Sequence, residues 1–521
     1  MDRRSFISVA GLTAAGALAS KPETVFAESA ARAEIAINYK NPLHKIPQTI
    51  YGHFIEELGK CIEGGIWRPV KGADQFLGGV PWDLVDAVMK IHPAVIRYPG
   101  GCYADSYHWQ DGIGPMAQRK TKPNLAWRMW GNYIGTPVSN QFGTDEFVLF
   151  CREVGAEPMM TANVGTGKPE EAAAWVEYCN GSASSKWGSE RAKNGHKEPF
   201  NVKYWFVGNE MWGAADGHFT PEKYGKRYLE FSRAMREKDP GVKLILSGWT
   251  DKANHWNQVV LETAGKDTDY LSIHSYWPLG TIYSDFVKYF MYDYVIEGVE
   301  KRIIPDLNKG IQAIEQWAPK DRDIKVTLDE WNVWFDGLEL HQTDYNLRDG
   351  IFVATVLNRL QALADKAPIA NIAQMVNCIG IIISDRRGTF LTPSAWAFNL
   401  YTERNLDRYL KPALAKEAKG LDVSASRDEA GGKLSIFLVN QNKDQAVNAQ
   451  ISLSDFAPAP QAEIATLHSK NPLAYNTFMQ PEKITPKITK LDLKLQDQGG
   501  QKSFGIELPA HSINVISCSK I

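Results

Sequence analysis

Short apolar runs and amphipathic helical patterns alternate along most of the chain. Residues 47–400 contain eight apolar or β-rich runs, separated by segments in which apolar residues recur every three or four positions. The runs are Thr49–Ile55, Ala94–Tyr98, Glu157–Val164, Tyr204–Val207, Val242–Ser247, Tyr270–Tyr276, Ile324–Leu328 and Met375–Ile383. Because they show little polar alternation, they predict strands buried on both faces. Eight strand–helix repeats over residues 47–400 predict a (β/α)8 TIM barrel, an α/β fold.

The segments between these runs carry a helical period. Clear examples are Trp82–Ile91, Thr144–Val154, Pro221–Lys238, Asn254–Ala264 and Leu347–Ala364. The helix after the fourth strand begins with Thr220 as a candidate N-cap, followed by a proline at the first helical position. This start signal supports the predicted boundary between strand and helix.

The pattern changes after about Tyr401, where the helical period fades and short alternating runs appear. These runs are Lys433–Val439, Ala446–Leu453, Glu463–Leu467, Thr489–Leu495, Phe504–Leu508 and Ser512–Ser517. Alternation between turn-forming residues predicts a C-terminal antiparallel β-sandwich over residues 401–521. An early run, Glu34–Tyr39, lies in the segment 31–46 and is expected to add an N-terminal strand to this sandwich.

The N-terminus has the pattern of a targeting segment. Arg3-Arg4-Ser5-Phe6-Ile7 is a twin-arginine pattern, and a weakly apolar run and an A-x-A-like region follow it. The apolar run is too short and too rich in glycine and alanine to span a membrane. Residues 1–30 are therefore predicted to be an export signal, which implies a periplasmic or secreted protein.

Composition narrows the function classes. The length of 521 residues fits two domains, and a formal charge of −2 with no basic stripe gives no support to nucleic-acid binding. The six cysteines are scattered without CxxC pairs, so neither a metal finger nor a disulfide framework is expected. No metal and no cofactor are predicted.

Two apolar runs end close to a glutamate. Glu210 follows the fourth run and Glu330 follows the seventh. The carboxyl ends of barrel strands meet at one mouth, so the two carboxylates are expected to face each other there. A pair about 5–5.5 Å apart is the equipment of a retaining glycosidase. A solvated glutamate at a strand end is the plain alternative, but the aromatic neighbours of both residues favour catalysis.

Other predicted strand ends are polar as well. His274 and Tyr276 close the sixth strand, where a tyrosine hydroxyl could donate to the nucleophilic carboxylate and a histidine could orient a carboxylate or the sugar. Glu56 or its neighbour Glu57, at the end of the first strand, could accept hydrogen bonds from sugar hydroxyls. A glycine pair precedes Cys102 after the second strand and allows close approach of the backbone to a ligand.

Several stretches, in order along nearly the whole mature chain, match one known family. They are Tyr51-Gly52-His53-Phe54-Ile55-Glu56, Arg97-Tyr98-Pro99-Gly100-Gly101, Tyr107-His108-Trp109-Gln110-Asp111-Gly112, Gly208-Asn209-Glu210-Met211, Asp329-Glu330-Trp331-Asn332 and Leu508-Pro509-Ala510-His511-Ser512. In these stretches the sequence resembles glycoside hydrolase family 51, the α-L-arabinofuranosidases.

The resemblance implies a retaining enzyme with Glu210 as acid/base and Glu330 as nucleophile. It further implies that Glu56 and Asn209 hold sugar hydroxyls and that His274 and Tyr276 shape the subsite around the nucleophile. The implied substrates are arabinan, arabinoxylan or their oligosaccharides, from which terminal α-L-arabinofuranosyl groups are removed. Related enzymes commonly assemble into homo-oligomers.

The sequence also departs from the family pattern. Cys102 stands where many members have asparagine, and a thiol is a weak hydrogen-bond partner for a sugar. A glutamine that some members use near the eighth strand is not located, because Phe390-Leu391-Thr392-Pro393 occupies the region. Two alternatives therefore stay open: the same mechanism on a β-xyloside or β-glucan, and a carbohydrate-binding barrel without catalysis.

Overall fold

The computed structural model describes residues 31–126, 137–213, 219–251, 253–278, 291–334, 345–416, 419–498 and 500–521. The predicted export signal, residues 1–30, lies outside the described residues.

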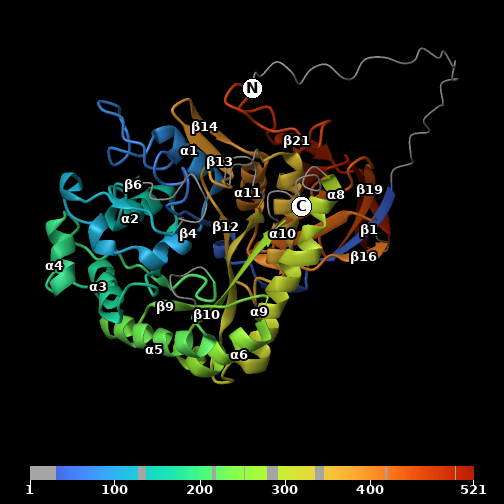
Figure 1. The fold of residues 1–521 in the computed structure, drawn as a ribbon. Helices are drawn as coiled ribbons and strands as arrows, with labels where there is room; N and C mark the ends of the chain where they lie inside the picture. Colours follow the sequence, from blue (N-terminus) through green and yellow to red (C-terminus); the bar gives the residue numbers. More distant parts are fainter. Residues whose placement is uncertain are drawn as a thin grey trace, which may run out of the picture.

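Eight parallel strands close a barrel (Figure 1), which confirms the predicted fold class. In order around the barrel they are β3 (Gly52–Phe54), β4 (Val95–Tyr98), β7 (Glu157–Ala162), β8 (Tyr204–Val207), β9 (Lys243–Ser247), β10 (Tyr270–Trp277), β11 (Lys325–Val333) and β12 (Ile369–Ala373). β12 pairs with β3, where Ile372 is opposite His53, and this pairing closes the ring. Because all eight strands run in one direction, their carboxyl ends form one mouth.

Helices follow the strands and cover the outside of the barrel (Figure 1). They are α1 (Trp82–Ile91), α2 (Thr144–Val154), α3 (Pro169–Asn180), α4 (Lys186–Lys193), α5 (Pro221–Lys238), α6 (Ala253–Ala264), α8 (Tyr292–Ile296), α9 (Ile304–Trp317), α10 (Leu347–Ala362) and α11 (Pro393–Arg404). The predicted start of α5 is confirmed, because the Thr220 hydroxyl accepts a hydrogen bond from the Lys223 N–H and caps the first turn.

The predicted position of the eighth strand is wrong. We expected it at Met375–Ile383, whereas β12 occupies Ile369–Ala373. The expected segment is apolar and largely buried, but Asn377 and Ile379 have φ of 58° and 42°. Residues in this left-handed region interrupt an extended chain. Part of the run instead enters a hairpin that follows the barrel strand, made of β13 (Ile382–Asp385) and β14 (Gly388–Leu391).

The seventh strand is also longer than predicted. We expected it to stop at Leu328, but β11 continues to its end through a bulge. Ile273 pairs with Leu328 and the next residue, His274, pairs with Glu330, so that Asp329 is the extra residue. A bulge changes the direction in which the following side chains point. Glu330 therefore lies within the strand, just past its irregularity.

Two sheets of the C-terminal region face each other across a separate hydrophobic core. The first contains, in order, β16 (Ala413–Lys416), β1 (Ala31–Asn38), β19 (Val447–Ser454), β23 (Gln501–Leu508) and β22 (Gln496–Gln498). The second contains β2 (Pro42–Lys45), β15 (Arg408–Leu410), β17 (Leu421–Arg427), β18 (Lys433–Asn440), β24 (Ser512–Ser519), β20 (Gln461–Leu467) and β21 (Lys487–Asp492).

The N-terminal strand lies inside the first of these sheets, between β16 and β19 (Figure 1). Its pairing with β19 is parallel, whereas the other neighbouring strands of both sheets are antiparallel. The expectation of a purely antiparallel sandwich is therefore wrong in this one pairing. A parallel neighbour arises because β1 enters the sheet from the far end of the chain rather than through a hairpin.

The seven-stranded sheet separates two cores. On β18, Leu434, Ile436 and Leu438 point into the core between the two sheets. The alternate residues Phe437 and Val439 belong to the core of the barrel. A sheet buried on both faces explains why β18 reads as an almost continuous apolar run.

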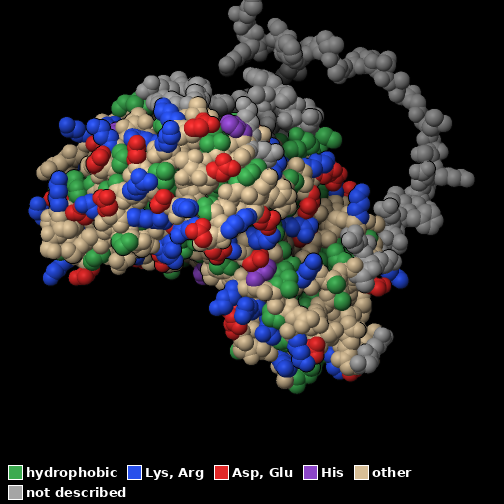
Figure 2. Space-filling view, turned by 90° about the horizontal axis from the view of Figure 1, so that it is seen from below, with side chains coloured by type: hydrophobic (Ala, Val, Ile, Leu, Met, Phe, Trp, Pro, Cys, Tyr) green, Lys and Arg blue, Asp and Glu red, His purple; other side chains and the backbone are tan. Residues whose placement is uncertain are grey.

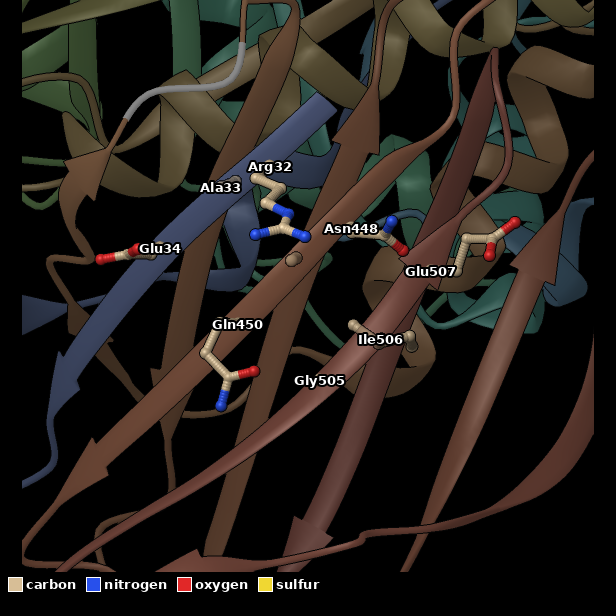
Figure 3. A pocket seen from close by; sticks show the side chains of 9 residues that line it. Arg32, Ala33, Glu34, Asn448, Gln450, Gly505, Ile506 and Glu507 are labelled. Carbon is tan, nitrogen blue, oxygen red and sulfur yellow. The ribbon is translucent and has the colours of Figure 1, made fainter. Parts of the chain in front are cut away.

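The surface carries both signs of charge. On the face shown in Figure 2, basic and acidic side chains are interspersed. Figure 3 shows a polar hollow on the five-stranded sheet, where Arg32, Asn448 and Glu507 project from three neighbouring strands. Within the described residues, no helix combines the length and apolar character that a membrane span needs.

Candidate active site

The two predicted catalytic carboxylates lie together at the barrel mouth. Glu210 follows β8 and Glu330 lies in β11. One oxygen of each carboxylate and Nδ1 of His274 all lie within 4.8 Å of one another. The Glu210 side chain is 19% exposed and the Glu330 side chain 8%, so both line a site that is largely shielded from solvent.

A turn in the left-handed region brings Glu210 into the mouth. Gly208 has a φ of 79° and Glu210 itself has a φ of 41°. Glycine adopts this region freely, whereas a residue with a side chain does so at a cost of about 1–2 kcal/mol. Backbone in a costly conformation is often found at functional sites, where the surroundings hold it in place.

His274 bridges the two carboxylates. Its Nδ1 donates to Oε1 of Glu210 at 2.8 Å and lies 3.5 Å from Oε2 of Glu330. Burial alone would lower the pKa of His274, but the two carboxylates outweigh it and raise the pKa above its ordinary value. The imidazole therefore favours its charged form between the two acids.

Glu330 is held by two donors. Nη1 of Arg97 donates to Oε1 of Glu330 at 2.7 Å, and the hydroxyl of Tyr276 donates to Oε2 at 2.8 Å. Burial would raise the pKa of Glu330, but His274, Arg97 and Tyr276 together hold it below its ordinary value. Glu330 is thus kept ionised in a buried site, as a nucleophile requires.

Arg97 connects the nucleophile candidate to the sugar-contact candidates, and the sequence did not predict this role. Besides Glu330 it donates to Oδ1 of Asn209 at 2.5 Å and to the hydroxyl of Thr161 at 3.1 Å. Its guanidinium lies 4.8 Å from the ring centre of Phe54. The only sequence signal was a fully buried arginine inside an otherwise apolar strand, the kind of residue that must be paired.

Glu56 lies beside the glycine pair that follows β4. Its Oε1 accepts the backbone N–H of Tyr103 at 2.9 Å. A Cβ at Gly101 would lie 2.5 Å from both carboxylate oxygens of Glu56, and Gly101 also has a φ of 27°. Only glycine fits this approach, which explains the glycine that the sequence places here.

Cys102 faces the same group of acids. Burial raises the pKa of its thiol well above the ordinary value, and the charges of Glu210, Glu56 and Glu330 raise it further. The side chain therefore stays a neutral thiol, which is a weak donor at the edge of the site.

Family models match the two halves of the chain separately. A model described as the α-L-arabinofuranosidase 1 domain matches residues 87–293, and one described as the α-L-arabinofuranosidase C-terminal domain matches residues 329–512.

Curated relatives are similar over almost the full length. The intracellular exo-α-L-arabinofuranosidase of Bacteroides ovatus is 33% identical, over 90% of this chain and 92% of that protein. α-L-Arabinofuranosidase C of Emericella nidulans is 31% identical, over 85% of this chain and 90% of its own length.

Solved structures show the same similarity. The α-L-arabinofuranosidase of Thermotoga maritima, solved as an arabinose complex, has a TM-score of 0.85 and is 33% identical, over 94% of this chain and 100% of that one. The family 51 enzyme of Thermotoga petrophila RKU-1 has a TM-score of 0.79 at 34% identity, over 93% and 99%. The chain belongs to the α-L-arabinofuranosidases of glycoside hydrolase family 51.

In this arabinofuranosidase the glutamine that the sequence did not locate is Gln374. It follows β12 directly, and its Nε2 lies 3.3 Å from Oε2 of Glu56, to which it donates. The sequence analysis missed it because the eighth strand was placed too late, so that Gln374 fell before the strand rather than at its end. A polar residue ending the run Ile369–Ala373 was the available signal.

Proposed function

We propose that this family 51 arabinofuranosidase is a retaining, exo-acting enzyme that removes terminal α-L-arabinofuranosyl groups from arabinan, arabinoxylan or their oligosaccharides. The supporting observation is the spacing of Glu210 and Glu330, whose nearest-grouped oxygens lie within 4.8 Å. Inverting enzymes need about 6.5–9.5 Å between their carboxyls to seat a water, whereas retaining enzymes need about 5–5.5 Å. The observed spacing fits direct attack by a carboxylate.

In the first step an oxygen of Glu330 forms a bond to the anomeric carbon while the glycosidic C–O bond breaks. Glu210 gives its proton to the departing oxygen. In the second step water attacks the same carbon, its proton passes to Glu210, and the ester bond to Glu330 breaks. Two displacements return the sugar with its original configuration.

Several buried polar atoms are available for the sugar. Among the described residues, Nδ2 of Asn209, Oε1 of Gln374 and Nε2 of His274 have no hydrogen-bond partner although they are buried. An unpaired buried polar atom costs about 1–3 kcal/mol, which a bound hydroxyl would recover. With Glu56 and Cys102 close by, these atoms support a subsite for a small, hydroxyl-rich ring.

The two-carboxylate assignment predicts distinct defects for two variants. Glu330→Ala should reduce turnover of 4-nitrophenyl α-L-arabinofuranoside to background, because no nucleophile remains. Glu210→Gln should lose about 100- to 10,000-fold on a glycoside with a poor leaving group, the usual contribution of general acid catalysis. Steady-state kinetics would measure both, and circular dichroism would check that the fold is retained.

Glu237→Gln, an exposed change on α5, is the matched control and should keep wild-type kinetics. Substantial residual turnover by Glu330→Ala would contradict the assignment. A panel of aryl α-L-arabinofuranosides, β-xylosides and β-glucosides would separate the rival substrates. NMR of the first-formed product from arabinoxylan and linear arabinan would show which linkage is cut and whether configuration is retained.

We also propose export through the twin-arginine route, on the basis of Arg3 and Arg4. The double change Arg3→Lys and Arg4→Lys should leave the enzyme in the cytoplasm, whereas the unchanged chain should reach the periplasm or the medium. Activity in separated cell fractions of a twin-arginine-competent bacterium measures this. Equal distribution of both forms would count against the proposal, and the Bacteroides ovatus relative is itself described as intracellular.

A further inference from the structure

Asp105 is a buried acid beside the catalytic loop for which the proposed mechanism has no use. It lies in the short 3-10 helix η2 (Cys102–Ser106), which follows β4, and is 3% exposed. Its two carboxylate oxygens accept the backbone N–H of Asn209 at 3.4 and 3.3 Å. The backbone N–H groups of Val164 and Gly165 also donate to this carboxylate.

The backbone of Asp105 is fixed from the same side. Its carbonyl oxygen accepts the N–H of Thr166 at 3.0 Å and the Thr166 hydroxyl at 3.1 Å. A Cβ at Gly165 would lie 2.6 Å from this carbonyl oxygen, so the two loops are in close contact. The segments that follow β4, β7 and β8 therefore meet at one carboxylate.

The Asn209 amide lies between the two left-handed residues that aim the acid/base candidate. Gly208 and Glu210 have φ of 79° and 41° on either side of it. Such a conformation persists only where neighbouring groups hold it. Burial raises the pKa of Asp105 to about 8, although the backbone donors lower it. A buried acid with a perturbed pKa beside a cleft is a common feature of functional sites.

We propose that Asp105 is a positioning residue for Glu210. Its carboxylate fixes the Asn209 amide and thereby holds the Glu210 carboxyl at the place where the glycosidic oxygen departs. Asp105 touches neither the sugar nor the reacting atoms. The inference rests on the proposed acid/base role of Glu210 and deepens it.

The leaving group of the substrate provides the test. In Asp105→Asn one accepting oxygen becomes an amide donor that opposes the backbone N–H groups. The acid should then be misplaced, so kcat/KM on methyl α-L-arabinofuranoside should fall about 10- to 100-fold, part of the full contribution of an acid catalyst. On 4-nitrophenyl α-L-arabinofuranoside, whose leaving group departs without a proton, the loss should be about threefold or less.

Two other variants frame this result. Glu210→Gln should show the same selectivity for leaving groups, with a larger loss. Asp145→Asn removes another buried carboxylate, which is 4% exposed and accepts the hydroxyl of Tyr178 on the outer helices. It should leave the ratio of the two kcat/KM values unchanged, even where it lowers the melting temperature.

Equal losses on both substrates in Asp105→Asn would overturn the inference. If that variant does not fold, Asp105→Ser, which is smaller and keeps an acceptor, gives the same comparison. Failure of both variants to fold would also overturn it, because Asp105 would then serve folding rather than positioning. Absence of turnover by the wild-type enzyme on either arabinofuranoside would instead overturn the proposed function.

Discussion

At the scale of single residues, the site depends on unequal treatment of similar groups. Glu330 receives an arginine and a tyrosine hydroxyl, whereas Glu210 receives only the shared histidine among the contacts described. Arg97 is completely buried and has no water to compensate its charge, so its pairing with Glu330 stabilises both. A carboxylate surrounded in this way stays ionised, and the other is left free to exchange protons.

Removal of the Tyr276 hydroxyl should shift the pH dependence of activity. Tyr276 donates to the ionised form of Glu330, and such a hydrogen bond favours the charged carboxylate. In Tyr276→Phe the pKa of Glu330 should rise by about one unit, given about 1.5 kcal/mol for a charge-assisted bond. Because Glu330 must be ionised to attack, the acidic limb of the kcat/KM profile should move to higher pH.

A pH series on 4-nitrophenyl α-L-arabinofuranoside measures this shift. Tyr178→Phe is the matched control, because it removes another buried hydroxyl that donates to a carboxylate, that of Asp145. Its acidic limb should stay in place. A Tyr276→Phe enzyme that lost activity equally at every pH would show that the hydroxyl orients the sugar rather than tunes the nucleophile.

At the scale of elements, sequence periodicity located helices better than strands. α1, α2 and α5 have the predicted bounds, because ten or more residues of amphipathic pattern and clear end signals specify them. The barrel strands are only three to nine residues long, and the apolar run at Ile369–Ala373 competes with a longer buried run just after it. Length and hydrophobicity alone favoured the wrong one.

The candidate site shows the same limit. Glu56, Cys102 and the residues at the ends of β8, β10 and β11 were predicted because each follows an apolar run, and the fold collects them at one mouth. Arg97 and Gln374 were not predicted. Arg97 bonds a residue 233 positions away and Gln374 one 318 positions away. Such contacts depend on the barrel closing, and local pattern carries no information about which distant side chains it brings together.

At the scale of the whole molecule, the barrel and the C-terminal sheets are joined by a shared core. The ring of Phe437 on β18 stacks on Tyr401 of α11 with 4.6 Å between centroids. Ile513 and Val515 of β24 belong to the same barrel core. An interface of apolar side chains buried from both parts couples their stabilities, so the described regions are expected to unfold together.

Phe437→Ala tests this coupling. The change should cost about 3–5 kcal/mol, because it leaves a cavity in the shared core. Calorimetry should show a transition several degrees lower, and loss of activity on heating should follow the same lower temperature. Met479→Ala is the control: it lies in the same C-terminal region but is 90% exposed and should change neither quantity. If Phe437→Ala lowers one part of the calorimetric transition while activity survives to the wild-type temperature, the barrel is stable without the sandwich and the two are not coupled. A single lowered transition would instead show that the sheet packed against α10 and α11 supports the barrel that carries the catalytic mouth.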